Sequence, residues 1–536
     1  MRTILYGVWL LGGVAALSSS VTGCTADCDA RGSCGDYTAP TAGASSEGTA
    51  GEGGSNDMSS AGIGGGSDAD AGNAGSSGAA GAGGSADDAG AAGAGSPPCD
   101  TTKSPTEESC LVSNDYAIFV APNGKNNAAG TMTAPLASLS KAIAMAGDTK
   151  FVIVCDAVYD EHVTISSRAQ VYGGFSCPGK GDTWIAETGA PLFKPSDAGP
   201  ALKIDSVDEE VVLEGLEFEA PAASVAGGNS IAAVVTASPS VTLSHVSLAA
   251  GAGMAGENGS LSPFAYKDQA TLDGNAETAA GVGGEEKSCA CQSGLQSVGG
   301  AGGPPASSGQ NGSDGLPNSG GGQAGDHSKA CSAGGGGGDG SAAPPVSPAA
   351  GATTLGTLSS DGWQPASGKD GVTGAPGQGG GGGASRNSLA HGGGGGCGGC
   401  GGNGGSSGKG GGGSIALLLV DSQVALNSCS LKTTSAGDGG AGVAGQLAQQ
   451  QVGNGGNSLA STNSCGGGSG GKGADGGASG GGAGGVSVAV LWKGKMAPTL
   501  TATTMTTGKA GAKGIGGAPG TNDGIAGLKQ DVLSLP

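Results

Sequence analysis

One spacing of apolar residues returns four times along this chain, and it limits the possible folds more than any other feature. The four copies are Val211-Leu213-Leu216-Phe218, Val241-Leu243-Val246-Leu248, Val424-Leu426-Cys429-Leu431 and, less regularly, Pro498-Leu500-Thr503-Met505. Each copy predicts two short strands with alternating inward residues, separated by a two-residue bend. Such a unit cannot bury its apolar face alone, whereas stacked copies can, so the repeat predicts a solenoid.

A further strand is predicted before the pair in three of the copies. These strands are Ser230-Ile231-Ala232, Ser414-Ile415-Ala416 and Ser487-Val488-Ala489. One unit then supplies three strands, as one coil of a parallel β-helix does. The sequence therefore predicts an all-β fold with long insertions between some of its coils.

Glycine fills those insertions. It accounts for 120 of the 536 residues, while aromatic residues are only 3% of the chain, so much of the sequence cannot build an apolar core. The glycine-rich tracts begin after Leu248, Leu431 and Met505, the same strand of each unit. If coils stack at about 4.8 Å, these exits lie one above another and the tracts form one lateral appendage. Packed polyglycine helices and disorder are both compatible with the tracts, since the three-residue glycine period at 368–377 is too short for a collagen triple helix.

The charge and the glycine motifs exclude several classes of ligand. A net charge of −21, with Arg2, Arg31, Arg168 and Arg386 as the arginines, argues against nucleic-acid binding. Gly466–Lys472 has the spacing of a phosphate loop, but Gly473 replaces the required Ser or Thr, so we expect no nucleotide. Gly334–Asp339 matches only the front of a calcium nonapeptide. We expect no cofactor and no metal.

The first residues read as an export signal. Arg2 precedes an apolar stretch from Ile4 to Leu17, and Val21-Thr22-Gly23-Cys24 follows. The last four residues resemble a bacterial lipobox, which implies that 1–23 is a lipoprotein signal peptide and that Cys24 is diacylated. The alternative is an ordinary secretory signal with Cys24 as a spare thiol. No later stretch has the roughly eighteen apolar residues of a spanning helix, so acyl chains would be the membrane anchor.

Residues 24–98 are predicted to be a disordered linker. From residue 35 on they are nearly all Gly, Ala, Ser, Asp, Thr and Glu. A flexible coil of this length reaches roughly 40–50 Å, enough to hold a domain clear of a membrane surface. Thr25, rather than Asp, follows the lipobox cysteine, which in many Gram-negative bacteria permits passage to the outer membrane. Exposure at the cell surface is a further expectation that this residue does not decide.

Fourteen cysteines in an exported chain favour disulfides over metal sites. Cys155 and Cys177 lie 22 residues apart, about one coil, and could join neighbouring coils. Cys28 with Cys34 and Cys99 with Cys110 could close small loops, but spacing alone does not fix the connectivity. Cys397-x-x-Cys400, near His391, has the spacing of a zinc site. A second pair from Cys289, Cys291 and Cys331 would require the glycine tract to fold back on itself, and disulfides are the favoured reading.

The start of the folded region resembles a known superfamily. A strand at 118–120, a helix at 135–146, a strand at 151–154 and a strand with Tyr159-x-Glu161-x-Val163-x-Ile165 follow one another. This order resembles the start of the pectate-lyase-like right-handed parallel β-helix, in particular an uncharacterised branch in bacterial surface lipoproteins. The resemblance covers 115–250 and, by repetition, 413–434 and 485–507. It implies that the helix caps the first coil, but it hardly restricts activity because the superfamily includes lyases, hydrolases and non-catalytic adhesins.

The predicted organisation follows from these boundaries. It comprises a signal peptide (1–23), a linker (24–98), the N-terminal part of the β-helix (99–250), a glycine-rich insertion (251–412), a coil (413–434), a second insertion (435–484), a coil (485–507) and a glycine-rich tail (508–536).

Our preferred hypothesis is an exported, membrane-anchored lipoprotein whose β-helix displays glycine-rich loops in a structural or adhesive role. Its partner would be a polysaccharide or a surface protein. The alternative is a polysaccharide lyase or glycoside hydrolase of the β-helix type, which would use outward carboxylates such as Asp160, Glu217 and Glu219. We assign no catalytic residue, and we read His162 and His245 as structural or surface residues.

Overall fold

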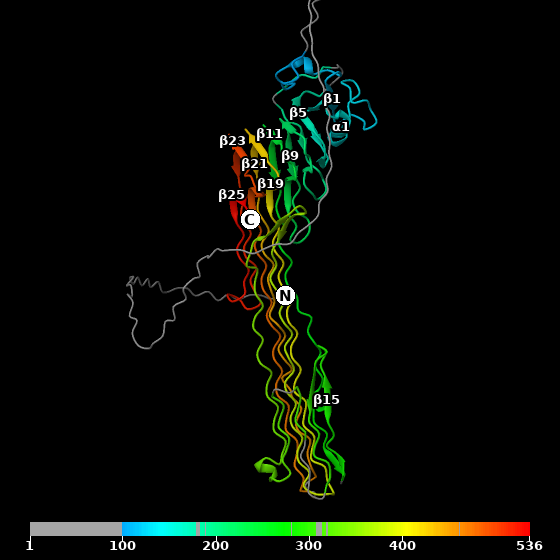
Figure 1. Cartoon of the computed structure of the whole chain (residues 1–536), viewed down its shortest axis with the longest axis vertical. Helices are drawn as coiled ribbons and strands as arrows, with labels where there is room; N and C mark the ends of the chain where they lie inside the picture. Colours follow the sequence, from blue (N-terminus) through cyan, green and yellow to red (C-terminus); the bar gives the residue numbers. More distant parts are fainter. Residues whose placement is uncertain are drawn as a thin grey trace, which may run out of the picture. The chain divides into compact units, whose positions relative to one another are not determined.

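The computed structural model describes residues 99–536 apart from 178–182, 188, 280, 307–312, 318–319, 460 and 462. All of these residues belong to one compact unit, Gly93–Pro536. The predicted signal peptide, lipidated Cys24, the Cys28/Cys34 pair and the linker lie outside the described residues. Most of the regular structure is β-strand, and three parallel sheets dominate it (Figure 1).

We call these sheets I, II and III, and together the scaffold. Sheet I has the order β1 (Ala117–Val120), β2 (Phe151–Cys155), β5 (Ala169–Phe175), β8 (Val211–Glu214), β11 (Val241–Ser244), β20 (Val424–Asn427) and β23 (Thr499–Thr501). Sheet II contains β3 (Val158–Tyr159), β6 (Leu192–Phe193), β9 (Glu217–Ala220), β12 (Ser247–Ala250), β21 (Ser430–Lys432) and β24 (Thr504–Thr506). Sheet III contains β4 (Val163–Ile165), β7 (Leu202–Asp205), β10 (Ser230–Thr236), β19 (Ser414–Val420), β22 (Ser487–Lys493) and β25 (Lys529–Ser534). From β2 onward the chain visits sheets I, II and III in turn, and all neighbours are parallel.

The strand register confirms the fourfold repeat. Leu213 pairs with Leu243, which pairs with Leu426, which in turn pairs with Leu500. In sheet II the corresponding row is Phe218, Leu248, Leu431 and Met505. The three predicted preceding strands also align, because Ser230 pairs with Ser414 and Ser414 with Ser487. Residues up to about 290 positions apart in sequence therefore form continuous apolar rows.

The predicted two-residue bends lie between sheets I and II. The first residue of each bend has a positive φ: Gly215 (64°), His245 (52°), Ser428 (53°) and Ala502 (47°). A left-handed residue turns the strand sharply and is strained in residues other than glycine. In the first three corners this residue's N–H donates to the next coil, as His245 does to the carbonyl of Asn427 at 2.9 Å, so the stacking holds these corners in place.

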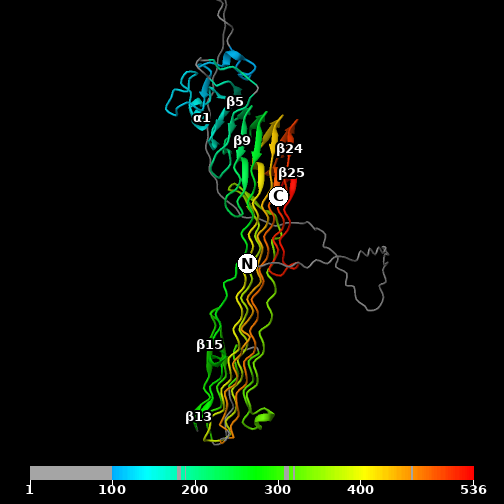
Figure 2. The same cartoon turned by 180° about the vertical axis from the view of Figure 1, so that it is seen from behind.

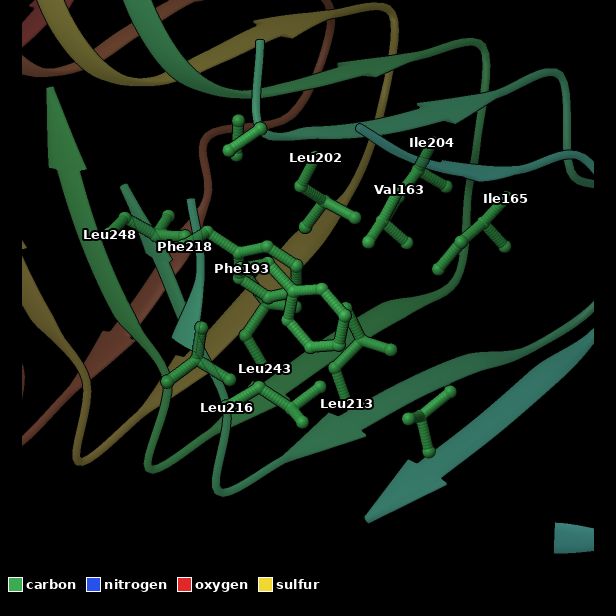
Figure 3. Close-up of a cluster of buried hydrophobic side chains, with 14 of the residues drawn as sticks. Val163, Ile165, Phe193, Leu202, Ile204, Leu213, Leu216, Phe218, Leu243 and Leu248 are labelled. Atoms are coloured by element: carbon green, nitrogen blue, oxygen red, sulfur yellow. The ribbon is translucent and has the colours of Figure 1, made fainter. Parts of the chain in front are cut away.

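One apolar core fills the space between the three sheets (Figure 3). Phe193 and Phe218 stack with ring centroids 5.3 Å apart, and Tyr159 stacks on Phe193 at 4.9 Å. Helix α1 (Leu139–Ala146) covers one end of this core with Leu139, Ala142 and Ile143.

Two local predictions need correction. The helix expected at 135–146 begins only at Leu139, because Ser138 is its N-cap and Leu136 forms a bridge with Val120. The segment from Tyr159 to Ile165 is not one strand, since a corner at 160–162 separates β3 in sheet II from β4 in sheet III.

The glycine-rich tracts are ordered, which decides between the two alternatives that the sequence left open. We call the described parts of residues 251–413, 433–486 and 507–528 the bundle; Figures 1 and 2 show most of their length as extended segments running side by side. Their backbone hydrogen bonds recur every third residue. Gly374, Gly377 and Gly380 donate to the carbonyls of Gly402, Gly399 and Gly396, and Gly402, Gly405 and Gly408 donate to those of Ala474, Gly477 and Gly480. A period of three without internal hydrogen bonds is that of the polyproline II helix, so the tracts are packed polyglycine helices.

Close backbone contact explains why these helices need glycine. A Cβ atom on Gly408 would lie 1.9 Å from the carbonyl oxygen of Gly440, and one on Gly395 would lie 1.9 Å from that of Gly380. From 397 to 409 the run 392–413 carries other residues at every third position, namely Cys397, Cys400, Asn403, Ser406 and Lys409, and Ser407 is its one further residue that is not glycine. Two faces of most turns are thus closed by neighbouring backbones, and the third takes a side chain. The exception is Ser407, a buried residue whose N–H donates to Asp370.

The exits of the tracts lie side by side, as predicted. The N–H of Gly253 donates to Ser435, and that of Ala436 donates to Lys509, which joins the starts of the three tracts. The returning segments are also bonded, Gly411 to Ala483 and Ser414 to Val486, and they continue directly into β19 and β22. The tracts therefore form one bundle that is continuous with sheet III.

A hairpin from the first tract covers the outer face of sheet III. Strands β17 (Gly356–Ser359) and β18 (Gly362–Pro365) bring Leu358 and Trp363 against Ile415, Leu418 and Val488. This second apolar layer explains why β19 reads Ser-Ile-Ala-Leu-Leu-Leu-Val, with every residue buried. The smaller elements of the first tract are β13 (Glu277–Ala279) with β14 (Val282–Gly283), β15 (Lys287–Ala290) with β16 (Gln296–Gly299), η2 (Gln269–Thr271) and η3 (Cys331–Ala333); η1 (Ser109–Leu111) precedes the scaffold.

Candidate functional site

Three of the carboxylates that a β-helix hydrolase could use make structural bonds in the scaffold. Both oxygens of Glu161 accept hydrogen bonds at the start of α1, from the Ser138 hydroxyl at 2.7 Å and from the N–H groups of Leu139 and Ser140 at 2.8 and 3.0 Å. Asp160 accepts from the N–H and the hydroxyl of Ser196. Glu219 forms an ion pair with Lys194 at 2.9 Å. These side chains stabilise corners and caps of the scaffold.

Neither strand beside β9 places a carboxylate next to Glu217 that could form a hydrolase pair with it. Glu217 points outward from β9, as predicted, and its register neighbours are Leu192 and Ser247. On the next coil Glu219 is opposite Ala249. A glycoside hydrolase needs two carboxyl groups roughly 5–10 Å apart, and the two strands beside Glu217 supply none. Glu219, two residues along the same face, is held in its ion pair with Lys194.

Glu214 is a half-buried carboxyl that the sequence did not single out. It lies on β8 between Tyr172 and Ser244, and its carboxylate accepts from the Thr106 hydroxyl at 3.4 Å. Burial raises the pKa of Glu214 and raises that of Tyr172 to about 12. The two histidines have structural roles, since His245 occupies a strained corner and Nδ1 of His162 lies 2.8 Å from the carbonyl of Pro200.

The glycine motifs lie within the bundle. In Gly466–Lys472, the N–H groups of Gly467, Gly468, Gly470 and Gly471 all donate to carbonyls of neighbouring helices. A phosphate loop binds its ligand through such N–H groups, so this segment has no free cradle for a phosphate. Asp339, in the calcium-like motif, accepts the N–H of Ser469 at 2.7 Å.

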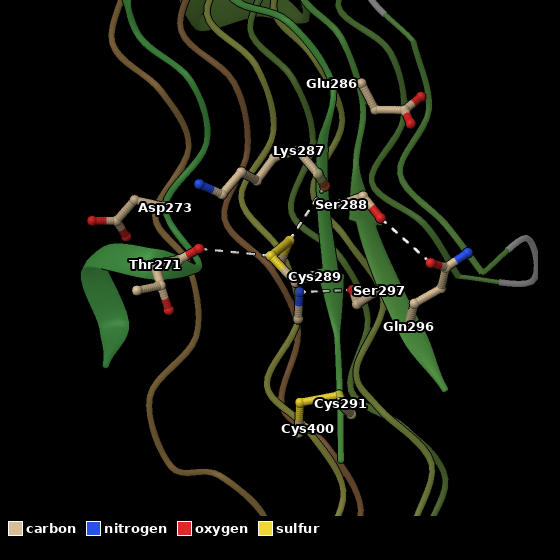
Figure 4. Close-up of a disulfide and its surroundings, with 12 residues drawn as sticks. Thr271, Asp273, Glu286, Lys287, Ser288, Cys289, Cys291, Gln296, Ser297 and Cys400 are labelled. Atoms are coloured by element: carbon tan, nitrogen blue, oxygen red, sulfur yellow. Dashed lines mark hydrogen bonds between the residues drawn. A yellow bond between two sulfur atoms is a disulfide. The ribbon is translucent and has the colours of Figure 1, made fainter. Parts of the chain in front are cut away.

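Three disulfides cross-link the bundle. The tract does fold back on itself: Cys289 bonds to Cys397 and Cys291 to Cys400, from hairpin β15–β16 to the neighbouring helix (Figure 4), and Cys331 bonds to Cys465. The Cys-x-x-Cys pair is therefore divided between two disulfides. No group of three or more His, Cys, Asp or Glu side chains suited to a metal ion occurs in the part of the chain that the structure describes.

The scaffold has its own disulfides and one free thiol. Cys155, at the end of β2, bonds to Cys177, just after the neighbouring β5, and Cys99 bonds to Cys110. Cys429, in the third copy of the apolar repeat, is free and buried, and burial raises the pKa of its thiol.

Acidic and amide side chains on the open faces bind neighbouring helices of the bundle. Each accepts one backbone N–H through its Oδ1 atom: Asn258 from Ala441, Asp273 from Asn454, Asp339 from Ser469, Asp370 from Ser407, Asp438 from Ala512 and Asp475 from Ala448, all at 2.7–2.8 Å. The bond from Ser407 lowers the pKa of Asp370. Sequence reasoning missed these contacts; the signal for them was Asp or Asn beside glycine triplets.

A polar hollow of about 470 Å³ lies beside the start of α1. It is lined by Pro122, Asn126, Ala137, Ser138, Val158, Tyr159, Asp160 and Glu161. Because Asp160 and Glu161 already accept hydrogen bonds there, the hollow offers no spare acid and base pair. We therefore regard the bundle, with its turns, as the candidate functional region.

Helices in the described ranges are too short or too polar to cross a membrane. Comparison with known proteins gives no relative: no family model, no curated protein and no solved structure matches this chain.

Proposed function

We propose that the scaffold is a right-handed parallel β-helix of the pectate-lyase-like type and that its function is to hold the bundle away from a cell envelope for recognition. The support for the fold is the strict rotation of strands through three parallel sheets and the capping by α1. The support for the function is one observation: three tracts far apart in sequence leave and rejoin the scaffold at one edge and hydrogen-bond to each other along their length.

Such a bundle is a spacer with fixed ends. Residues 392–413 run without a turn, and at about 3.1 Å per residue they span about 65 Å. At the far end of this run, residues 385–391 connect two antiparallel helices, and the Ser385 hydroxyl donates to Ala390 at 2.8 Å. Arg386 donates to the carbonyl of Lys329, beside the Cys331–Cys465 disulfide. We call 326–336 and 385–391 the distal turns, and loops held on a rigid support are where binding residues concentrate.

We propose that the chain is exported, that Cys24 carries the lipid and that the protein is held in the outer membrane with the bundle exposed outside the cell. Disulfides in both regions fit an oxidising compartment. The partner is a polysaccharide or a surface protein, and Leu389, two-thirds exposed in a distal turn, is an apolar contact for it.

Binding to cell surfaces and glycans tests the recognition role. Full-length protein would be compared with the variant Arg386→Ala/Leu389→Ala in a glycan array and in a cell-adhesion assay. We expect binding by the wild type and at least a tenfold loss for the variant. The matched control is Val225→Ala, an exposed apolar change at the scaffold end of the bundle, which should bind normally.

Enzymatic assays test the opposing class. Cleavage of uronate polymers or neutral glycans by full-length protein, abolished by Glu217→Gln or Asp160→Asn, would replace display by catalysis as the function. Labelling of Cys24-dependent acyl chains, lost in Cys24→Ser, tests the anchor separately.

A further inference from the structure

The two ends of the scaffold differ in how they are covered. At the first end, α1 packs on the core, and β1 adds a strand that has no counterpart in sheets II and III. At the other end, β23, β24 and β25 each pair with a scaffold strand on one side only, and no described residue pairs with their outer edges. Leu500 is 39% exposed there, while Met505 and Val532 are only partly buried. Unpaired strand edges beside apolar side chains favour pairing with another chain.

We propose that this open end binds the same end of a second copy of the chain, giving a two-fold symmetric dimer. The inference rests on the three-sided β-helix of the proposed function. The two-fold axis of such a dimer is perpendicular to the direction in which the coils stack. One sheet then meets the same sheet of the second copy, and each of the other two sheets meets the other one. With β25 on the axis, β25 pairs antiparallel with the partner's β25, and β23 faces the partner's β24.

The exchanged strands match in length and pattern. Strand β23 reads Thr499-Leu500-Thr501 and β24 reads Thr504-Met505-Thr506, each with an apolar residue between two threonines. Leu500 and Met505 belong to the inner rows of the repeat. In the dimer each would be covered by the other across the interface, and threonines would pair with threonines, a favourable cross-strand combination.

The charges of β25 are also self-complementary. Lys529 and Asp531 flank Gln530, so antiparallel pairing with Gln530 on the axis places each Lys529 opposite the Asp531 of the other copy. Opposite charges directly across two strands stabilise pairing, and like charges weaken it.

Sedimentation of the full-length protein in detergent tests the proposal. We expect a dimer for the wild type, at least a tenfold weaker dimer for Asp531→Lys, and recovery in the double variant Lys529→Asp/Asp531→Lys, which reverses both charges. Asp531 also accepts from Thr507 at 3.3 Å, so circular dichroism would check the fold of each variant.

A cross-link tests the register independently. Gln530→Cys should form a disulfide-linked dimer on oxidation, and Thr164→Cys, exposed on β4 at the capped end, should not. A wild-type protein that stays monomeric and a Gln530→Cys variant that does not cross-link would overturn the proposal, and so would a dimer that Asp531→Lys leaves unchanged. The binding assays on the distal-turn variant test the proposed function and not the dimer, because the distal turns are not part of the open end formed by β23, β24 and β25.

Discussion

The scaffold and the bundle solve the problem of burial in opposite ways. In the scaffold, apolar side chains fill the space between backbones, and rows such as Leu213, Leu243 and Leu426 exclude water. In the bundle, the backbones themselves fill the space, because glycine allows carbonyls of neighbouring helices to approach where a Cβ atom would lie. The scaffold is stabilised mainly by the hydrophobic effect, and the bundle by repeated hydrogen bonds and cross-links.

This difference teaches that a glycine-rich, low-aromatic tract need not lack a fold. Each polyglycine helix loses more backbone entropy on ordering than a richer sequence would, and it gains no apolar side-chain burial. The compensation comes from neighbours on several sides, from open-face Asp and Asn side chains and from three disulfides. The bundle should therefore depend on the scaffold, which fixes where its helices begin and end.

The largest effect tests that dependence. Phe218→Ala removes a ring that is 1% exposed and stacked on Phe193, and we expect a loss of about 3–5 kcal/mol in the free energy of unfolding. Denaturant unfolding followed by circular dichroism measures it, and Thr242→Ala, on the outer face of β11, is the control. Amide exchange should rise in the bundle as well as in the scaffold; a bundle that keeps its protection would show that it is stable by itself.

Loss of a bundle cross-link should act on the bundle alone. Cys331→Ser/Cys465→Ser opens a disulfide that closes 134 residues, and we expect about 2–5 kcal/mol less stability in the helices near it. Hydrogen exchange in 326–340 and 463–470 should rise, while β8 and β11 stay protected. Faster exchange in the scaffold strands would contradict the separation of the two regions.

A single methyl group distinguishes the closed faces of the bundle from the open ones. Gly408→Ala would place its Cβ atom 1.9 Å from the carbonyl oxygen of Gly440, so the helices must separate, at a cost of about 1–3 kcal/mol. Lys409→Ala changes the adjacent open position and should alter stability by less than about 0.5 kcal/mol. Thermal unfolding of the two variants gives the comparison, and equal effects would refute the assignment of faces.

The sequence predicted the scaffold far better than the bundle, and the reason is physical. Alternating apolar residues indicate which side chains are buried, so the rows that contain Leu213 and Phe218 could be inferred from their spacing. The stacked exits of the tracts followed from the same spacing. Glycine carries no side chain to report its surroundings. The signal in the bundle was instead the residues that are not glycine, such as Cys397, Cys400 and Asn403 at every third position.

The candidate site was less predictable, since the partners of its side chains lie far away in the chain. Asp370 bonds to Ser407, and Asp438 to Ala512, contacts that only the packing of the helices defines. The same holds for Asp160, which the sequence offered for chemistry and which instead accepts hydrogen bonds from the N–H and the hydroxyl of Ser196. The disulfide connectivity in the bundle could not be predicted either. It depends on the tract folding back on itself, which the spacing of the cysteines did not decide.

The smallest expected effect is a local response of the bundle to acid. Asp523 accepts hydrogen bonds from Lys513 and from the N–H groups of Gly516 and Gly520, and the pKa of its carboxyl is lowered to about 2, chiefly by Lys513. A pKa below the unfolded value of 3.8 means that this carboxylate stabilises the turn above about pH 4 and loses its effect as the pH falls toward 2. Exchange of amides in 516–523 should therefore rise between pH 4 and pH 2, after correction for the intrinsic rate.

Asp523→Asn should show the raised exchange already at pH 5 and a flat pH response, whereas Asp361→Asn, exposed in the β17–β18 turn, should behave as the wild type does. If Asp523→Asn keeps the wild-type response, other carboxylates of the bundle cause the acid sensitivity. The Asp side chains that accept N–H groups from neighbouring helices would be tested next.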